Sequence, residues 1–483
     1  MPTPRTTSSS LSWVTPCSCC SDGRSRMADH PGHGVARRLF AARLTASLMP
    51  LNSTMIAVAV PAVAAEFGYS VTTVTQALVA TYLITAIALQ SPGGKLADRF
   101  GQWRVVSFGQ AAIATGSLLG LVAPNLAALT VARVLMACGG ALVVPATVSL
   151  MRLELPPERR GRAFGTFGAI MGLAAAVGPV LGGVLVEAFS WEAVFLANVP
   201  VLAVSALVAA NVPLAVPPST ATRFDWWGSA LLTSGLVLVV VGTQGGRASS
   251  VLVLAVGVAA LISFGWWETR TRDPVVDFRL FRSVPFAAGS LLIALQNLVM
   301  YALLFELPLV LGDLFELNAQ VIGQLLSFLM GAMVAMSLLA GRLTDRLGPR
   351  SVALAGALLC LVGLLALDRS GLSAPGDVRI PLVLLGAGLG LSSPAAQSAS
   401  LSAVAPGQSG MAAGVASTMR YLGAVVGIAL LGRLLDLDGS RAQVLAEHRA
   451  VLAVFAVTLV GSLVCAAVLP RREGMAVLAK RSG

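Results

Sequence analysis

Charged residues are scarce in this chain. They make up 11% of its 483 residues, whereas an average soluble domain has about 25%. Hydrophobic residues make up 56%. A soluble protein cannot hide that much apolar surface, so the composition excludes an ordinary soluble protein and indicates a membrane protein.

The chain also lacks the motifs on which enzymes and disulfide-rich proteins depend. It has no phosphate-binding loop, metal cluster or nucleophile motif, so we expect neither an enzyme nor a bound cofactor or metal. The cluster Cys17, Cys19 and Cys20 has no partner at zinc-site spacing. The other cysteines lie in apolar runs and predict packing residues: Cys138, Cys360 and Cys465. The three histidines fall in the N-terminal tail or a predicted outer loop, and we assign them no proton-carrying role: His30, His33 and His448.

The first 36 residues differ from the rest. They are polar, without periodicity, and lack the charged start and apolar core of a secretory signal. We expect them to be disordered. Met27 opens a more usual membrane-protein start, so residues 1–26 are either an over-extended gene start or a disordered extension.

Fourteen apolar runs are long enough to span a bilayer, which takes about 20 residues of helix. We predict spans near residues 39–63, 71–91, 103–123, 126–150, 163–186, 193–214, 226–243, 250–267, 285–311, 319–340, 351–367, 379–399, 410–432 and 449–469. With the N-terminus inside, the inner segments carry 25 of the 33 Lys and Arg residues and the outer loops carry 6. The net charge of +11 therefore indicates a membrane surface rather than nucleic acid, and both termini are predicted to be cytoplasmic.

One octapeptide pattern occurs twice, each time at the end of an apolar run. Residues 94–101 and 341–348 both read G-x-L-x-D-R-x-G. The repeat indicates two copies of one membrane unit. Its aspartate can hold a facing arginine or the positive N-terminus of a neighbouring helix, which predicts a breakable latch; the alternative is a short charged turn. The latch candidates are Gly94, Asp98, Arg99 and Gly101, with Gly341, Asp345, Arg346 and Gly348.

These octapeptides resemble the loop signature of the major facilitator superfamily, and the chain is similar to its fourteen-helix drug:proton antiporter branch. The resemblance covers about residues 48–469. It implies an all-α membrane fold with two six-helix bundles and two inserted helices. The expected divisions are a disordered extension (1–36), an N-terminal bundle (37–218), an inserted pair with its linker (219–283), a C-terminal bundle (284–470) and a cytoplasmic tail (471–483).

Two further motifs resemble the family but depart from it at polar positions. Residues 51–61 are similar to L-D-x-T-I-V-N-V-A-L-P, with Asn52 at the position of the usual acid. Asparagine cannot titrate, so the resemblance does not extend to proton coupling there. Residues 133–141 resemble R-x-x-Q-G-x-G-A-A and keep Arg133. We predict that Arg133 tunes a nearby acid or binds an anionic group; the alternative is that it snorkels to the outer surface.

The predicted fifth helix carries a pattern similar to the antiporter signature G-x8-G-x3-G-P-x2-G-G. Ala174 replaces its second glycine. Small residues allow close helix packing and the proline predicts a bend; the alternative is a packing face without a gating role. The matching residues are Gly165, Gly178, Pro179, Gly182 and Gly183.

Because Asn52 cannot titrate, a proton-coupled mechanism needs another acid at membrane depth. Glu306 is the candidate well inside a predicted span, where an unpaired carboxyl can bind and release a proton. The alternative is that it reaches water at the outer end. Other polar candidates for a substrate site between the halves are Gln296, Asn297 and Arg420. The few fixed charges favour neutral or amphipathic cargo.

Together these patterns predict a monomeric secondary transporter of the bacterial cytoplasmic membrane that exports small amphipathic compounds by alternating access. Its expected partners are the substrate and the lipid bilayer, and a proton gradient is the expected energy source. Uptake or facilitated passage of a metabolite remains an alternative, as does a membrane sensor or scaffold on the same fold.

Overall fold

The computed structural model describes residues 31–209, 224–243, 248–317, 319–435 and 441–472. Regular structure in these ranges is helical. A helix satisfies every backbone N–H and C=O within itself, which a segment in hydrocarbon requires. Eleven helices in the described ranges are long and apolar enough to cross a membrane, and two shorter apolar helices cover 193–209 and 226–239. Residues 1–30 of the expected disordered extension, with Cys17, Cys19 and Cys20, lie outside the described residues. Residues 31–36 were expected to be disordered as well, but they belong to the helix that begins at Pro31, so this part of the prediction is wrong.

The N-terminal half contains nine α-helices and a π-helical turn. They are α1 (Pro31–Ala46), α2 (Leu48–Phe67), α3 (Val71–Thr75), η1 (Gln76–Ala80), α4 (Thr81–Phe100), α5 (Gln102–Leu121), α6 (Leu126–Glu154), α7 (Pro157–Ala188), α8 (Ala193–Leu196) and α9 (Asn198–Ala209).

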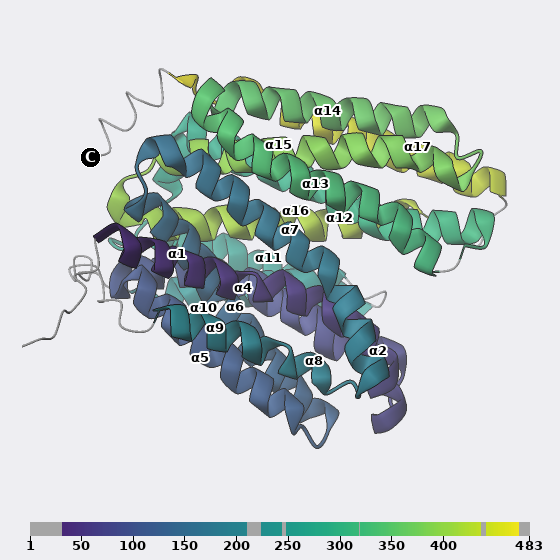
Figure 1. The fold of residues 1–483 in the computed structure, drawn as a ribbon, viewed down its shortest axis with the longest axis horizontal. Coiled ribbons are helices and arrows are strands. Elements are labelled where there is room, and N and C mark those ends of the chain that lie inside the picture. Colours follow the sequence, from purple (N-terminus) through teal and green to yellow (C-terminus); the bar gives the residue numbers. More distant parts are fainter. Residues whose placement is uncertain (1–30, 210–223, 244–247, 318, 436–440, 473–483) are drawn as a thin grey trace, which may run out of the picture.

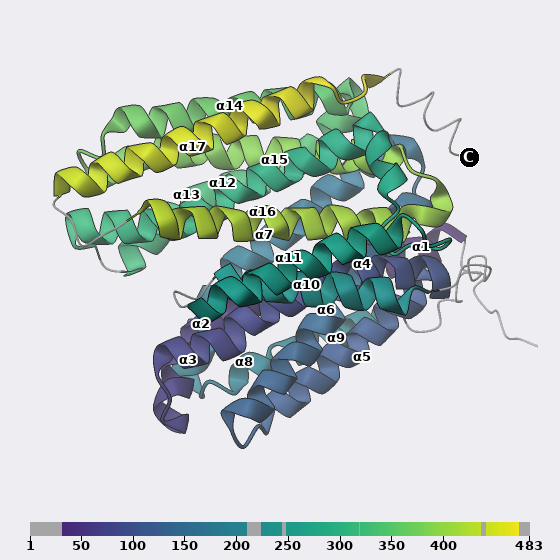
Figure 2. The same cartoon turned by 180° about the vertical axis from the view of Figure 1, so that it is seen from behind.

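Two helices of the middle segment, α10 (Trp226–Thr243) and α11 (Ala248–Glu268), pack on each other, and α10 also packs on α4. Figure 2 shows this pair beside α4 and α16. The short helix η2 (Phe278–Arg282) then leads into the C-terminal half. That half contains α12 (Val284–Phe315), α13 (Ala319–Leu347), α14 (Pro349–Ser370), η3 (Pro375–Val378), α15 (Arg379–Ser402), η4 (Pro406–Gln408), α16 (Ser409–Leu434) and α17 (Arg441–Ala467).

The two halves meet mainly through two helix pairs, α4 with α16 and α7 with α13. In both pairs the helix backbones touch at the first glycine of an octapeptide, Gly94 against Gly410 and Gly341 against Arg162. We call this region of the molecule the octapeptide end. From there the halves diverge, and Figure 1 shows the start of α1 and the end of α17 at this same end. The largest apolar cluster fills the N-terminal half and continues across the octapeptide end into the first turns of α16, where it includes Met411 and Val415. Two further clusters lie within the C-terminal half.

The helices extend further than the apolar runs predict. For example, α4 continues to Phe100 and α13 to Leu347, whereas the predicted spans stop at residues 91 and 340. The additional turns contain the charged octapeptide residues, which have low hydropathy but accept helical geometry. The helices therefore carry the octapeptides as rigid ends rather than as loose loops.

Candidate functional site

The aspartate of each octapeptide holds a helix of the opposite half. In α4, the Asp98 carboxylate accepts hydrogen bonds from the backbone N–H groups of Gly410 (2.6 Å) and Met411 (2.7 Å) in the first turn of α16. In α13, the Asp345 carboxylate accepts from Gly161 N (2.9 Å) and Arg162 N (3.0 Å) in α7. The two contacts are related by the internal repeat.

These contacts differ in depth. The N–H groups held by Asp98 belong to the first turn of a helix, where backbone donors have no intrahelical acceptor and the helix dipole favours an anion. Asp98 is buried, whereas Asp345 is half-buried and reaches α7 a turn further in. The Asp98 contact therefore stabilises the approach of the halves more strongly.

The first glycine of each octapeptide allows the helices to touch. A Cβ on Gly94 would collide with the Gly410 carbonyl, and a Cβ on Gly341 would lie 2.7 Å from the Arg162 Cα and the Gly161 carbonyl oxygen. The last glycines, Gly101 and Gly348, have φ of 95° and 84°. Only glycine adopts this region without strain, so it turns the chain between consecutive helices.

The octapeptide arginines do not form the ion pairs that one version of the latch hypothesis allowed. Within the described ranges, neither Arg99 nor Arg346 pairs with an aspartate. The Arg99 guanidinium lies 5.2 Å from the centroid of the Phe100 ring, and the Arg346 carbonyl accepts a hydrogen bond from Arg472 Nη1 at 3.0 Å. The aspartates thus bind backbone donors rather than arginines.

Arg152 adds a cross-half contact that the sequence patterns did not reveal. It lies at the end of α6 and donates to the Val404 carbonyl, to the Ser409 hydroxyl and, at 3.3 Å, to the Ala405 carbonyl. In sequence it looked like one of several inner-loop basic residues. The sequence gives little indication of this contact, because the acceptors of Arg152 are mostly backbone carbonyls, which any residue type provides.

The glycine motif of α7 serves two different interfaces. Gly165 packs against α13 of the other half, where its carbonyl accepts from the Ser337 hydroxyl at 3.0 Å. Gly178 and Gly182 pack against α2 of their own half, and Gly183 approaches the Val58 side chain there. Pro179 lies between them inside α7. The helix α7 therefore contacts α13 at the octapeptide end and α2 further along its length.

Asn52 is buried and fixed by two hydrogen bonds. Its Nδ2 group donates to the Leu48 carbonyl (2.8 Å) and to Asn198 Oδ1 (2.7 Å). Asn198 in turn donates to the Phe195 carbonyl at 3.1 Å, which sets its orientation. The local structure thus requires a donor at position 52, and an aspartate there would face two acceptors.

Replacing Asn52 with aspartate is therefore expected to destabilise the protein. The Asn52→Asp change removes two hydrogen bonds and buries a charge, which should lower the free energy of unfolding by on the order of 3 kcal/mol. Thermal unfolding of purified protein in detergent measures this as a lower melting temperature. A variant with unchanged melting temperature and stronger proton-driven transport would contradict this interpretation.

Arg133 is fully buried, so the alternative that it snorkels to the surface is wrong. Its Nε group donates to the Leu78 carbonyl (3.1 Å) and Nη2 to the Asn52 carbonyl (3.2 Å). The guanidinium also lies 4.2 Å from the centroid of the Tyr82 ring. Leu78 belongs to the π-helical turn η1, a distortion that is common at functional sites.

Glu306 does not reach water either. It is fully buried, and its Oε1 lies 2.7 Å from His448 Nδ1. The placement of His448 in an outer loop was wrong, because α17 begins at Arg441 and buries His448 against α12. The polar Glu447, His448 and Arg449 lowered the local hydropathy and so hid this first part of the helix.

The remaining polar candidates have different surroundings. Gln296 donates to the Ser392 hydroxyl at 2.8 Å and so links α12 to α15. Asn297 donates to the Ile293 carbonyl of its own helix at 2.8 Å. Arg420 is half-buried near the middle of α16. Gln296 and Asn297 therefore already have partners, and Arg420 is the more available group.

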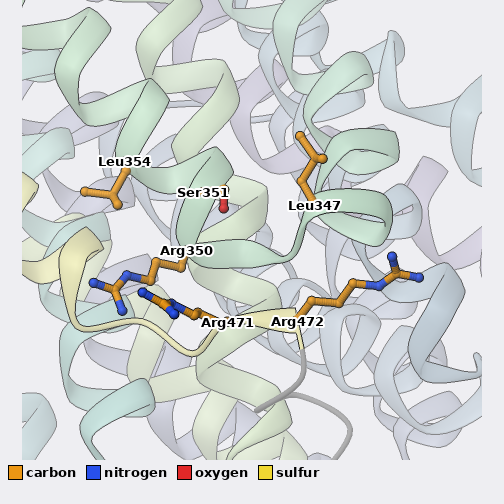
Figure 3. A pocket seen from close by; sticks show the side chains of 6 residues that line it. All are labelled: Leu347, Arg350, Ser351, Leu354, Arg471 and Arg472. Atoms are coloured by element: carbon orange, nitrogen blue, oxygen red, sulfur yellow. The ribbon is translucent and has the colours of Figure 1, made fainter.

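A basic pocket of about 450 Å³ lies beyond the second octapeptide, at the start of α14 and the end of the described chain. Figure 3 shows Arg350 and Arg471 pointing the same way, whereas Arg472 points in the opposite direction. The lining residues are Leu347, Arg350, Ser351, Leu354, Arg471 and Arg472. None of these is acidic, so the pocket concentrates positive charge at the octapeptide end.

A family model described as Major Facilitator Superfamily matches residues 44–428. The chain belongs to the major facilitator superfamily. It is a multi-pass membrane transporter rather than an enzyme, as its family and apolar helices show. The two octapeptides and the glycine motif of α7 lie within the matched range.

Relatives of this major facilitator protein include antibiotic-resistance and export proteins. The tetracenomycin C resistance and export protein of Streptomyces glaucescens is 31% identical over 86% of this chain and 79% of its own. A multidrug resistance protein B homolog of Mycobacterium tuberculosis is 28% identical over 91% of this chain and 83% of its own.

A solved structure shares the fold. The proton:xylose symporter XylE matches with a TM-score of 0.66 at 15% identity, over 93% of this chain and all of that chain. Low identity limits this comparison to the arrangement of helices.

Proposed function

We propose that this protein exports small amphipathic compounds by alternating access and is driven by proton antiport. The observation that carries the proposal is the pair of cross-half contacts at one end, in which Asp98 and Asp345 each hold a helix of the opposite half. A transporter that rocks its halves must break and re-form such contacts. The similarity to resistance and export proteins supports the export direction.

The octapeptide end faces the cytoplasm in this proposal, with fourteen spans and both termini inside. The charge distribution supports this orientation, because basic residues concentrate on the cytoplasmic side of membrane proteins. The pocket formed around Arg350 and Arg471 lies at that end. The conformation described, with the halves joined at the octapeptide end, is then the outward-facing one.

The proton-carrying group in this proposal is the Glu306–His448 pair. Both side chains are buried among apolar residues of α12 and α17, including Leu303, Leu307 and Val451. Glu306 Oε2 and His448 Nε2 have no hydrogen-bond partner among the described residues. Holding one proton between the two side chains avoids a net buried charge, so gain or loss of a proton is coupled to the packing of these helices.

The test uses purified protein in proteoliposomes with an imposed pH gradient. Transport of anionic, neutral and cationic amphipathic compounds is measured alongside exchange of labelled substrate without a gradient. We expect gradient-driven accumulation of at least one compound. We expect the Glu306→Gln change to lower that accumulation at least tenfold while exchange persists.

The control is Asp313→Asn, which removes an exposed carboxyl from the same helix and should keep gradient-driven transport. If no compound moves by either measurement, the export proposal is wrong. If compounds exchange but the wild-type protein does not accumulate them when a pH gradient is imposed, transport is facilitated and only the proton-antiport part of the proposal is wrong.

A further inference from the structure

Two arginines lie at membrane depth without an acidic partner. Arg133 in α6 is fully buried and Arg420 in α16 is half-buried. Within the described residues, neither forms a salt bridge, and the Asp98 and Asp345 carboxylates are engaged at the octapeptide end. The contact of Arg133 with α2 is to the neutral Asn52 backbone carbonyl. Uncompensated cations inside a membrane are costly and are retained at functional sites.

Three of the chain's four tyrosines gather around these arginines. Tyr82 in α4 stacks under Arg133, and its hydroxyl donates to the Met49 carbonyl at 3.1 Å. The Tyr421 hydroxyl in α16 lies 3.6 Å from the Met49 sulfur, so Met49 contacts the hydroxyls of both Tyr82 and Tyr421, and Arg420 directly precedes Tyr421 in α16. Tyr301 lies in α12, which packs against α16.

The cluster therefore takes residues from both halves, from α4 and α6 on one side and from α12 and α16 on the other. It combines positive charge, hydroxyl donors and aromatic faces. Arg133 also carries an Nη1 group without a hydrogen-bond partner among the described residues. Arg420 is the accessible cation, because Arg133 is already held by the Leu78 and Asn52 carbonyls.

We propose that this cluster binds the anionic group of the exported substrate, so that the cargo is an amphipathic organic anion such as an aromatic carboxylate. Arg420 pairs with the carboxylate, since a guanidinium can donate two parallel hydrogen bonds to it. Arg133 adds positive potential from within the N-terminal half. The half-buried rings of Tyr301 and Tyr421 contact the apolar body of the substrate. This assignment rests on the proposed export function and replaces the expectation of neutral cargo.

The test compares three probes that share one aromatic body: pyrenebutyrate, its uncharged amide and the cationic pyrenebutylamine. Binding to the purified full-length protein is measured by fluorescence titration, and transport is measured in proteoliposomes. We expect the wild-type protein to bind the carboxylate at least tenfold more tightly than the amide. The Arg420→Gln change should reduce this ratio to near one. The Arg420→Lys change should give an intermediate ratio, because lysine keeps the positive charge but cannot donate two parallel hydrogen bonds to the carboxylate.

The control is Arg441→Gln, an exposed arginine at the start of α17, which should keep the wild-type ratio. Should Arg420→Gln fail to fold, Tyr421→Phe provides a second variant, with an expected severalfold loss of carboxylate preference. Preferred binding of the amine, or an unchanged ratio in Arg420→Gln, would overturn the proposal. Transport of the amide or amine without the carboxylate would leave the export function intact and refute only the charge assignment. If none of the three probes binds or is transported, both the charge assignment and the export function are contradicted.

Discussion

Replacing Asp98 with asparagine is expected to reduce export at least tenfold. The carboxylate accepts from both Gly410 N and Met411 N in the first turn of α16. Asparagine can accept only through its oxygen, so its amide donor would face one of these N–H donors, and the charge that complements the helix dipole is lost. A charged hydrogen bond contributes about 1.5–3 kcal/mol, which corresponds to roughly a 10- to 100-fold change in the balance between conformations.

Efflux of a transported compound from proteoliposomes measures this effect. Asp345→Asn should reduce export less than Asp98→Asn, because Asp345 is half-buried and binds α7 beyond its first turn. Asp368→Asn, at an exposed position on α14, is the matched control and should transport normally. Equal activity of the Asp98→Asn variant and the wild type would show that this contact has no role in transport.

Adding a single methyl group at Gly94 is expected to have an effect of similar size. A Cβ there collides with the Gly410 carbonyl and lies 3.1 Å from the Gly414 Cα, both backbone atoms that cannot rotate away. Gly94→Ala should therefore separate α4 from α16 at the octapeptide end and lower export at least tenfold. The reactivity of a cysteine placed at Ser91 toward a water-soluble thiol reagent should rise as this interface opens.

Gly331→Ala is the matched control for this change. Gly331 also lies in a membrane helix, but nothing approaches within 4 Å of the position a Cβ would take there. Both substitutions bring the same gain in helix propensity, so a difference in export between the two variants is caused by the collision at the α4–α16 interface. Equal loss of export in the two variants would refute the steric explanation.

The sequence predicted the helices well because hydropathy reports burial in lipid directly. Each of the fourteen predicted ranges contains helix. Helix ends were predicted less well, because charged residues such as Asp98 and Asp345 continue a helix without adding hydropathy. The same effect moved His448 into a predicted loop and hid its contact with Glu306.

The candidate site was predictable only where a motif carried it. The repeated octapeptide located Asp98 and Asp345, but the sequence did not identify their partners in α16 and α7, since those partners are backbone N–H groups. Arg133 was singled out as a charge within a span. Its proximity to Tyr82 depends on the packing of α6 against α4, which no local pattern encodes.

The central claim is that the octapeptide end must open during transport, and a reversible cross-link across it is the most direct test. The Ser91 and Thr418 hydroxyls lie 3.1 Å apart on α4 and α16. Cysteines at both positions, in a chain whose native cysteines are replaced with serine, should form a disulfide on oxidation. We predict that oxidation stops export, that a reductant restores it, and that each single-cysteine variant is unaffected. Continued export by the fully cross-linked protein would contradict the account.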